Sequence, residues 1–311
     1  MSILSFIIPT LNEESNIYKL LESIRLNMGS KHTYEIIVID NGSTDNTVLI
    51  AEKYAEVYIV PNRTIGYLRN FGVNKSKSKI LVFLDGDVYL TSKWIENLPN
   101  TINLLNNNHL IITGSRCGIS EQPCFIERVW FKPLLNEKAN YINSGHLIVT
   151  RYLFDIIGGF SENLVTDEDY DFSKRAQELG ASLLNDPRLE VVHEGYPKNI
   201  SSFVKREIWH GKDDFRSIKH IITSKVSILT IMFLLLHSMI ILSFFFNICF
   251  LNIIYLTIIL TFICFLSALV KYKKPISVVL FNTMIYYFFF AVRSIALIIF
   301  INHKIKKILV R

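Results

Sequence analysis

Ile80-Leu81-Val82-Phe83-Leu84-Asp85-Gly86-Asp87 is the stretch that decides the fold. A short apolar run followed at once by two carboxylates is typical of a buried β-strand that ends in a polar loop. Because side chains alternate along an extended chain, Asp85 and Asp87 face the same way, and Gly86 lets a ligand approach the backbone. Two neighbouring acids repel each other unless a cation lies between them, and a hard divalent ion, Mg²⁺ or Mn²⁺, that bridges to phosphate oxygens is the natural occupant. The alternative is a plain polar turn, because Asp-x-Asp is common by chance.

Further apolar, strand-length runs lie at residues 4–8, 36–39 and 57–60. Between them, residues 15–26 and 44–54 carry apolar side chains at helical spacing. Near-continuous apolar strands separated by helices predict an α/β domain with a mostly parallel sheet covered by helices on both faces. In such sheets ligands bind at the carboxyl ends of the strands, so the chemistry is expected just after each strand.

Two polar loops follow the first two predicted strands, at residues 9–13 and 40–45. They are plain loops in one interpretation, in which Ser43 or Thr44 caps the next helix. Asp40, however, directly ends an apolar strand on the ligand-binding edge. A carboxylate in that place is able to accept the imino N–H of a uracil ring.

Thr166-Asp167-Glu168-Asp169-Tyr170-Asp171 forms an acidic cluster ahead of a helical pattern that runs to Gly180. Acids at a helix N-terminus stabilise the helix dipole, which is the structural interpretation. The functional interpretation makes one of these carboxylates a general base. The cluster taken alone leaves both open.

The C-terminal third differs in composition from the rest of the chain. All 27 Asp and Glu residues lie at or before Asp214, and the segment from Phe215 onward carries 11 Lys and Arg. Residues 226–270 contain no charge, which is long enough for two spans of about 20 residues each. This basic excess flanks apolar runs, so it predicts an integral membrane protein in contact with the bilayer rather than a nucleic-acid-binding protein.

Asn247 and Asn252 are the expected turn between the two spans, and a third apolar stretch, at residues 276–302, is interrupted by Arg293. A charge at the hydrocarbon centre costs roughly 3 kcal/mol on insertion scales. With a cytoplasmic catalytic domain, the second span returns Lys271, Lys273 and Lys274 to the cytoplasm, in agreement with the positive-inside rule. We therefore expect two firm spans and a third element that is tilted or re-entrant. It would keep the basic tail near the cytoplasmic face: His303, Lys304, Lys306, Lys307 and Arg311.

The four cysteines are too few and too scattered for a disulfide framework, and they predict free thiols in a reducing compartment. Cys117 and Cys124 have no histidine at zinc-ligand spacing. The first nine residues have no basic n-region and only a strand-length apolar run, so no signal peptide is expected.

Taken together, the motifs resemble glycosyltransferase family 2, the inverting enzymes with the GT-A fold. The resemblance covers about residues 4–215. Each motif alone is weak evidence for the family, but all six in this order and spacing are highly specific for it. The motifs are Ile8-Pro9-Thr10-Leu11-Asn12-Glu13, Val38-Ile39-Asp40-Asn41-Gly42-Ser43-Thr44-Asp45, Gly66-Tyr67-Leu68-Arg69-Asn70-Phe71-Gly72, Phe83-Leu84-Asp85-Gly86-Asp87, Gly158-Gly159-Phe160 and Glu168-Asp169-Tyr170-Asp171.

The resemblance implies roles by position. Asp169 corresponds to the catalytic base, with Glu168 beside it, and Asp85 and Asp87 correspond to the metal-binding motif. The residues implied in binding the nucleotide-sugar are Pro9, Thr10, Glu13, Asp40, Arg69, Asp85, Asn143 and Gly145.

Some of these assignments have a plain structural alternative. Arg69 lies where the family approaches the nucleotide phosphates, but it is equally compatible with a helix-surface arginine. His193 follows an apolar run where related enzymes place a further metal ligand, yet a lone histidine at a strand end is often structural.

Lys205-Arg206-Glu207-Ile208-Trp209-His210-Gly211 lies just before the apolar region. It predicts an interfacial amphipathic helix with Trp209 at headgroup depth. In the resembling family, residues such as Arg206, Trp209 and His210 border the acceptor and the leaving diphosphate, and both roles are compatible. The Gln-x-x-Arg-Trp motif of processive polysaccharide synthases is absent from the sequence, which argues against a polymerase.

We therefore expect a catalytic domain at residues 1–215 and a membrane region at residues 216–311, consisting of an interfacial helix and two to three transmembrane helices. The expected reaction moves a sugar from a nucleotide-sugar, with UDP favoured, to a lipid-linked or other membrane-associated acceptor, with a divalent metal as cofactor. The alternatives are a polyprenyl-phosphate glycosyltransferase, whose anionic acceptor needs no base, and a catalytically inactive membrane scaffold. A nucleotide-binding regulator is disfavoured because the sequence has no Gly-x-x-x-x-Gly-Lys motif.

Overall fold

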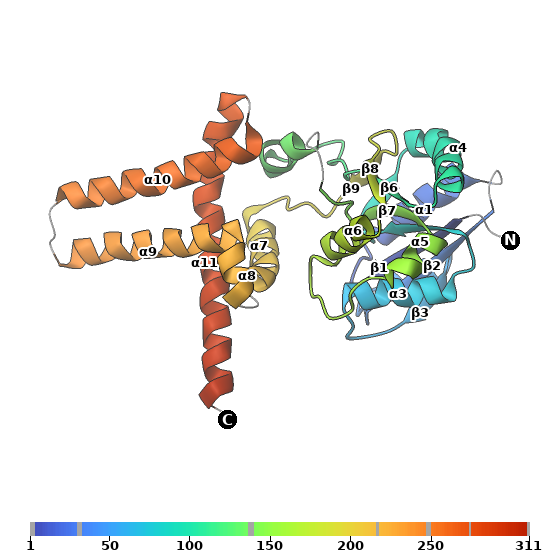
Figure 1. Cartoon of the computed structure of the whole chain (residues 1–311), viewed down its shortest axis with the longest axis horizontal. Helices are drawn as coiled ribbons and strands as arrows, with labels where there is room; N and C mark the ends of the chain where they lie inside the picture. Colours follow the sequence, from blue (N-terminus) through green and yellow to red (C-terminus); the bar gives the residue numbers. More distant parts are fainter. Residues whose placement is uncertain are drawn as a thin grey trace. The chain divides into compact units, whose positions relative to one another are not determined.

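The computed structural model describes residues 4–29, 33–135, 140–215, 218–246, 250–273 and 275–309. The chain divides into two compact units (Figure 1). The first, which we call the catalytic unit, comprises Met1–Gln122 and Leu135–Tyr196. The second, the helical unit, comprises Pro123–Leu134 and Pro197–Arg311.

A seven-stranded sheet forms the centre of the catalytic unit, in the order β3-β2-β1-β4-β7-β6-β8. The four strands β1 to β4 are parallel to one another, whereas β7 is antiparallel to both of its neighbours, and β6 and β8 are parallel. The predicted mostly parallel α/β sheet is confirmed. The strands are β1 (Leu4–Thr10), β2 (Tyr34–Asp40), β3 (Glu56–Ile59), β4 (Ile80–Leu84), β6 (Ile111–Gly114), β7 (His146–Thr150) and β8 (Ser182–Asn185).

Helices cover both faces of this sheet, because alternate strand residues point to opposite sides. Phe6 and Val82 belong to one buried apolar cluster, with α1 and α4 above them. Ile7 and Phe83 belong to the other, which α3, α5 and α6 cover. The helices are α1 (Ile17–Met28), α2 (Thr47–Ala51), α3 (Ile65–Lys75), α4 (Ser92–Asn107), α5 (Arg151–Ile157) and α6 (Glu168–Glu178).

A second, two-stranded sheet lies beyond the acidic turn that ends β4. It pairs β5 (Val88–Leu90) antiparallel with β9 (Val191–His193), so that Val88 is opposite His193. This pairing brings a histidine that is far away in the sequence next to Asp87.

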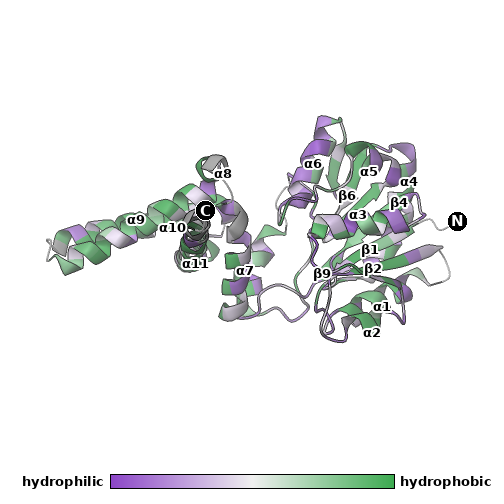
Figure 2. Cartoon of the chain, turned by 90° about the horizontal axis from the view of Figure 1, so that it is seen from below, coloured by the Kyte–Doolittle hydropathy of each residue, from purple (hydrophilic) through white to green (hydrophobic). Residues whose placement is uncertain are grey.

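The helical unit contains three helices that are long and apolar enough to cross a membrane: Lys225–Phe245, Leu251–Tyr272 and Ile276–Asn302. Figure 2 shows their predominantly apolar colouring beside the mixed surface of α7. The elements of this unit are the π-helix η1 (Glu127–Phe131), the 3₁₀ helix η2 (Lys132–Leu134), α7 (Ile200–Asp214), α8 (Ile218–Thr223), α9 (Lys225–Phe245), α10 (Phe250–Tyr272) and α11 (Ile276–Leu309).

The boundary between the two units differs from the expected one. The predicted interfacial helix, α7, lies within the range expected for the catalytic domain, but it belongs to the helical unit because its buried face packs on α11 through Phe203 and Glu207. The segment Pro123–Leu134 also joins this unit, since Trp130 is buried among aromatic side chains from α7, α10 and α11.

For the third apolar element, the structure rules out a re-entrant form that enters the bilayer and turns back. α11 is one unbroken helix of 34 residues. Asn252, expected in the turn between the spans, lies instead in the first turn of α10. Asn247, Lys274 and the side chains of the basic tail from His303 to Arg311 lie outside the described residues.

Candidate active site

The acidic turn after β4 is the centre of the candidate site. Asp85 and Asp87 lie directly after the strand, as the sequence predicts, but they have different partners. Asp85 Oδ1 accepts a hydrogen bond from Arg69 at 2.7 Å, whereas Asp87 Oδ2 lies 3.3 Å from Nε2 of His193. Asp87 Oδ1 is buried and accepts no hydrogen bond from the described residues. Burial and the charge of Asp85 raise the pKa of Asp87 to about 7.

Arg69 is an internal clamp and not a helix-surface residue. It is 1% exposed, and besides Asp85 it bonds Glu168 Oε1 at 2.6 Å. Burial disfavours its charged form, but the carboxylates of Asp85 and Glu168 outweigh burial, and the pKa of Arg69 is raised. With its guanidinium engaged by two carboxylates, Arg69 ties the turn after β4 to the N-terminus of α6.

The N-terminus of α6 places Glu168 and Asp169 side by side in the interior. Glu168 is held by Arg69 and by the hydroxyl of Ser144 at 3.1 Å. Asp169 Oδ1 accepts the Tyr170 backbone N–H at 2.7 Å. Burial, together with the charge of Glu168, raises the pKa of Asp169 to about 7. A buried carboxylate that ionises near neutrality suits a general base.

The turn before β7 lies against Asp85. The backbone N–H of Gly145 donates to Asn143 Oδ1 at 2.7 Å, and Asp85 N–H donates to the Gly145 carbonyl. A Cβ on Gly145 would lie 2.8 Å from both Asn143 Oδ1 and Asp85 Oδ2. Asn143 and Gly145 are therefore beside the acidic turn, and their implied part in nucleotide-sugar binding stays a prediction.

Glu13 lies at the acidic turn as well, although the sequence placed it in a nucleoside pocket. Its Cγ is 3.1 Å from the position of a Cβ on Gly86. Burial, with the charges of Asp87 and Asp85, raises the pKa of Glu13 to about 7, against the opposing hydrogen bond from Asn16. Three carboxylates thus share this corner of the site.

Asp40 organises its own loop. It is fully buried, its Oδ2 accepts the backbone N–H groups of Gly42 and Ser43, and its Oδ1 accepts the Ser43 and Thr10 hydroxyls. Both oxygens thus shape the loop, and the predicted contact with a uracil ring stays a prediction. Pro9 is likewise a buried residue of β1.

Two features of the site were missed by sequence reasoning. A Cβ on Gly195 would overlap Asp87 Oδ2, so this glycine is required beside the carboxylate. The loops after β1 and β2 also interlock, since Asn12 Oδ1 accepts the Thr44 N–H and Asn12 N–H donates to the Ser43 hydroxyl. A glycine after His193 was the available signal for the first feature; the second depends on partners about thirty residues apart.

The predicted metal ligands Asp85, Asp87 and His193 do not form a ready-made cluster. Across the described part of the chain, no group of three or more His, Cys, Asp or Glu side chains is arranged to hold a metal ion. The donor set still fits a hard divalent cation, because Asp87 presents a buried oxygen with no donor, and Mg²⁺ typically takes one or two carboxylates plus substrate phosphates.

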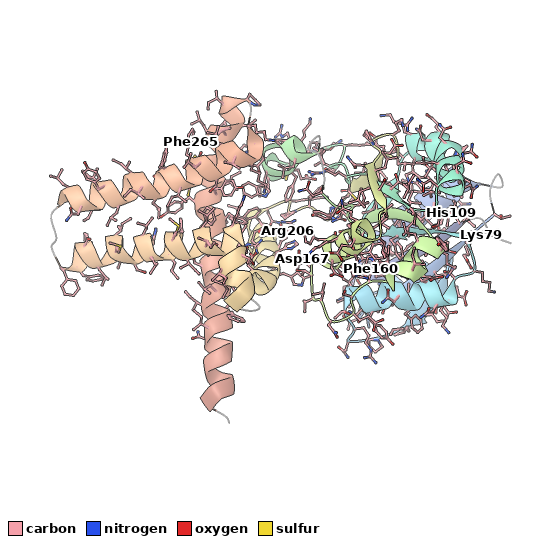
Figure 3. All side chains as sticks on the ribbon, in the orientation of Figure 1. Lys79, His109, Phe160, Asp167, Arg206 and Phe265 are labelled. Carbon is pink, nitrogen blue, oxygen red and sulfur yellow. The ribbon has the colours of Figure 1, made fainter. Side chains whose placement is uncertain are left out.

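The residues predicted for the acceptor side lie on α7, in the helical unit. Arg206, labelled in Figure 3, bonds Glu207 at 2.6 Å and lies over the ring of Phe131. Trp209 is 42% exposed, and its ring packs against His210. Burial, followed by the charges of Arg206 and Arg293, lowers the pKa of His210 to about 3, so its imidazole is neutral.

Comparison with known proteins adds independent information. Residues 5–152 match the family model described as Glycosyl transferase family 2. Glycosyltransferase AglE of Haloferax volcanii is 30% identical over 191 residues, which cover 58% of this chain and 62% of AglE.

Poly(ribitol-phosphate) beta-N-acetylglucosaminyltransferase TarS of Staphylococcus aureus is 28% identical over 238 residues, 71% of this chain and 40% of TarS. The chain thus spans less than two thirds of the length of these two curated relatives. A structure of TarS residues 1–349 in complex with UDP superposes with a TM-score of 0.50 at 23% identity, covering 72% of this chain and 66% of that one.

Mannosyltransferase PcManGT from Pyrobaculum calidifontis, solved in complex with GDP-Man and Mn²⁺, gives a TM-score of 0.53 at 18% identity. The match covers 68% of this chain and 61% of PcManGT. At this level of identity the likeness concerns the fold, and it agrees with the predicted GT-A architecture.

Proposed function

We propose that this chain, whose residues 5–152 match the glycosyl transferase family 2 model, transfers a sugar from a nucleotide-sugar to a membrane-associated acceptor, with inversion at the anomeric carbon. The observation that carries the proposal is the Arg69 clamp, in which a buried guanidinium joins the half-buried Asp85 to the buried Glu168. It links the acid turn expected at the donor diphosphate to the helix that presents Asp169.

In the proposed reaction, an acceptor hydroxyl attacks the anomeric carbon while the bond from that carbon to the diphosphate oxygen breaks. Asp169 takes the hydroxyl proton, and the leaving diphosphate keeps the electron pair of the broken bond. Arg69 and Ser144 hold Glu168, which lies next to Asp169 at the start of α6. A general base of this kind contributes about 10²–10⁴-fold.

Asp87 and His193, with Asp85 and Glu13 beside them, are the side chains that would hold a divalent cation together with the donor phosphates. When bound, the ion offsets charge that develops on the departing diphosphate. The buried, donor-free oxygen of Asp87 supports this part of the proposal.

We favour UDP as the nucleotide, because TarS, a relative in sequence and in fold, has been solved with UDP. The acceptor is proposed to be lipid-linked, since three helices of the same chain are apolar enough to enter a bilayer. The catalytic unit is proposed to be cytoplasmic, where nucleotide sugars are made, and Arg206, Trp209 and His210 are proposed to border the acceptor.

Purified full-length protein in lipid nanodiscs tests this function with a panel of UDP- and GDP-sugars, with Mg²⁺ or Mn²⁺. We expect hydrolysis of one donor class. Asp87→Ala should abolish transfer and weaken metal-dependent UDP binding measured by calorimetry. Asp155→Ala removes an exposed acid of α5 and should behave as wild type.

Equal, metal-independent UDP binding by wild type and Asp87→Ala would contradict the metal role. Absence of hydrolysis and of nucleotide binding in a well-folded protein would favour the inactive scaffold. Transfer to a polyprenyl phosphate but to no hydroxyl acceptor would replace the proposed acceptor class.

A further inference from the structure

We propose that the bilayer is crossed by α9 and α10 alone, and that α11 lies along the membrane surface on the catalytic side, with its exposed apolar face against lipid. By length and composition α11 is able to cross. Its neighbours within the helical unit argue that it does not. This inference concerns topology and is independent of the sugar, the acceptor and the reaction.

The first argument is that the polar helix α7 runs beside the middle of α11. Phe203 stacks on Phe288 with ring centroids 6.1 Å apart, and one turn later Glu207 bonds Arg293. A further turn on, a Cβ on Gly211 would lie 2.6 Å from the Cβ of Ala296. The contacts advance in the same direction along both helices, so the two helices are neighbours over several turns.

α7 belongs to the aqueous or headgroup region. Its sequence carries six charged residues among 15, and Lys205 is exposed. The α11 residues beside it, from Phe288 to Ala296, run from the centre of the apolar stretch Ile276–Asn302 towards its C-terminal end. In a crossing helix this centre would lie about 15 Å below the hydrocarbon surface, half of the roughly 30 Å core. It is therefore held at the depth of α7.

The second argument is electrostatic. Arg293 is 8% exposed and bonds both Glu207 at 2.8 Å and Asp214 at 2.5 Å. If Arg293 crossed at mid-bilayer, these two carboxylates of α7 would have to enter the hydrocarbon with it. Burying an ion costs desolvation energy even when the ion is paired, and a position at the membrane interface avoids most of that cost.

The third argument is that α11 leaves the far half of the α9–α10 hairpin uncovered. It meets α9 through Phe233 and His237, close to the middle of that helix, and these contacts do not reach its far end. Phe244, Phe245 and Tyr255, which flank the far end of the hairpin, are at least 69% exposed. Figures 1 and 2 agree: α11 runs across the base of the hairpin, and in Figure 2 it is seen nearly end-on while α9 and α10 are seen from the side.

The distribution of polar and apolar side chains on α11 is the reverse of that on a water-soluble helix. Its polar Asn282 and Arg293 are buried, whereas Met284, Ile295 and Ile298 lie on one exposed stripe and are 74%, 46% and 46% exposed. Apolar residues facing outwards identify lipid as the occupant of this face. The apolar stretch is followed in the sequence by the basic residues Lys304, Lys306 and Lys307, which suit anionic headgroups.

A cysteine-accessibility experiment tests the topology in intact cells. In a variant whose native cysteines are replaced by serine, one cysteine is placed at Phe246→Cys, at the end of α9, and another after Arg311. We expect an impermeant thiol reagent to label the first from outside and the second only after permeabilisation. A reporter protein fused to the C-terminus of the native sequence gives the same answer without cysteine replacement. Labelling of the appended cysteine from outside would overturn the proposal.

Depth measurements separate a surface helix from one that dips into the bilayer. Nitroxide labels at Met284→Cys, Ile295→Cys and Ile298→Cys should report similar shallow depths, about 5–10 Å below the headgroups. A label at Leu235→Cys, exposed near the middle of α9, is the deep control. Any α11 position as deep as the control would overturn the surface placement.

Discussion

Arg69 in the catalytic unit and Arg293 in the helical unit are both buried, and each bonds two carboxylates. The physical device is the same, because a buried guanidinium needs paired acceptors to offset its desolvation. The partners differ in what they carry. Arg69 joins Asp85 and Glu168, which belong to the candidate site, whereas the acids of Arg293 both come from α7.

The comparison shows that the role of a buried ion pair, in catalysis or in assembly, can be assigned only when the residues that form it are known. In the catalytic unit the clamp fixes side chains within the sub-ångström tolerances that catalysis requires. In the helical unit it fixes a polar helix against an apolar one. We therefore expect removal of Arg69 to affect chemistry and removal of Arg293 to affect assembly.

The largest effect is expected next to the Arg69 clamp, at Asp169. Asp169→Asn keeps the shape but cannot take a proton, so turnover should fall at least about 100-fold, the lower end of general-base contributions. Donor affinity, measured by calorimetry, should survive. Glu178→Gln alters an exposed acid at the other end of α6 and serves as the control. Near-normal turnover would point instead to Glu168, Asp171 or a phosphate acceptor.

The pH profile of the wild type sharpens this test. Burial and the charge of Glu168 raise the pKa of Asp169 to about 7, above the ordinary range of an aspartate. Only the ionised form accepts a proton, so turnover should rise up to about pH 7 and fall about tenfold per unit below it. The fall in turnover below pH 7 should be missing from the residual activity of Asp169→Asn. If the fall persisted there, it would have to be assigned to another ionisable group.

The second prediction removes the two buried arginines, Arg69 and Arg293, in separate variants. Arg69→Met and Arg293→Met each leave one buried carboxylate, Glu168 or Glu207, and one half-buried carboxylate without their cation, which should destabilise the protein by about 3–5 kcal/mol. Only Arg69→Met should also lower donor hydrolysis per folded molecule, by up to about 100-fold, because Asp85 and Glu168 lose their positions. UDP-binding stoichiometry counts the folded molecules.

Arg69→Lys keeps the charge but not the fork that reaches both acids, so it should restore part of the activity. Equal losses of hydrolysis in Arg69→Met and Arg293→Met would remove the distinction between the clamps. A large loss of stability without loss of hydrolysis in Arg69→Met would make Arg69 a structural residue.

The fold of the catalytic unit was largely readable because its strands are apolar runs of strand length. The strand Ile80–Leu84 has the predicted bounds, and the acids after it lie where the alternation of side chains places them. Residues 44–54 give only a short helix, Thr47–Ala51, because Asp45 and Thr44 bond partners within the interlocked loops. The antiparallel strand β7 was not predicted, since strand order depends on tertiary pairing.

Individual roles were less predictable, for a related reason. The partners of Arg69 are 16 and 99 residues away, and those of Arg293 are 79 and 86 residues away. Sequence spacing alone cannot show which carboxylates meet a guanidinium. Arg293 therefore looked like a charge stranded in an apolar stretch, although α7 supplies its two acids.

The smallest effects are expected at two glycines, Gly195 in the catalytic unit and Gly211 in the helical unit. At these positions close steric contacts, and not charges, distinguish the two units. A Cβ on Gly195 would overlap Asp87 Oδ2, and one on Gly211 would lie 2.6 Å from the Cβ of Ala296. Gly211→Ala should destabilise by about 1–3 kcal/mol through overpacking of α7 on α11, with donor hydrolysis per folded molecule unchanged. Gly195→Ala lies in an exposed loop and should change stability less, but it displaces Asp87 and should weaken metal-dependent UDP binding about tenfold, or roughly 1.4 kcal/mol. Thermal unfolding and calorimetry on both variants separate the two outcomes. If Gly211→Ala weakened UDP binding while Gly195→Ala did not, the division of labour between the two units would be wrong.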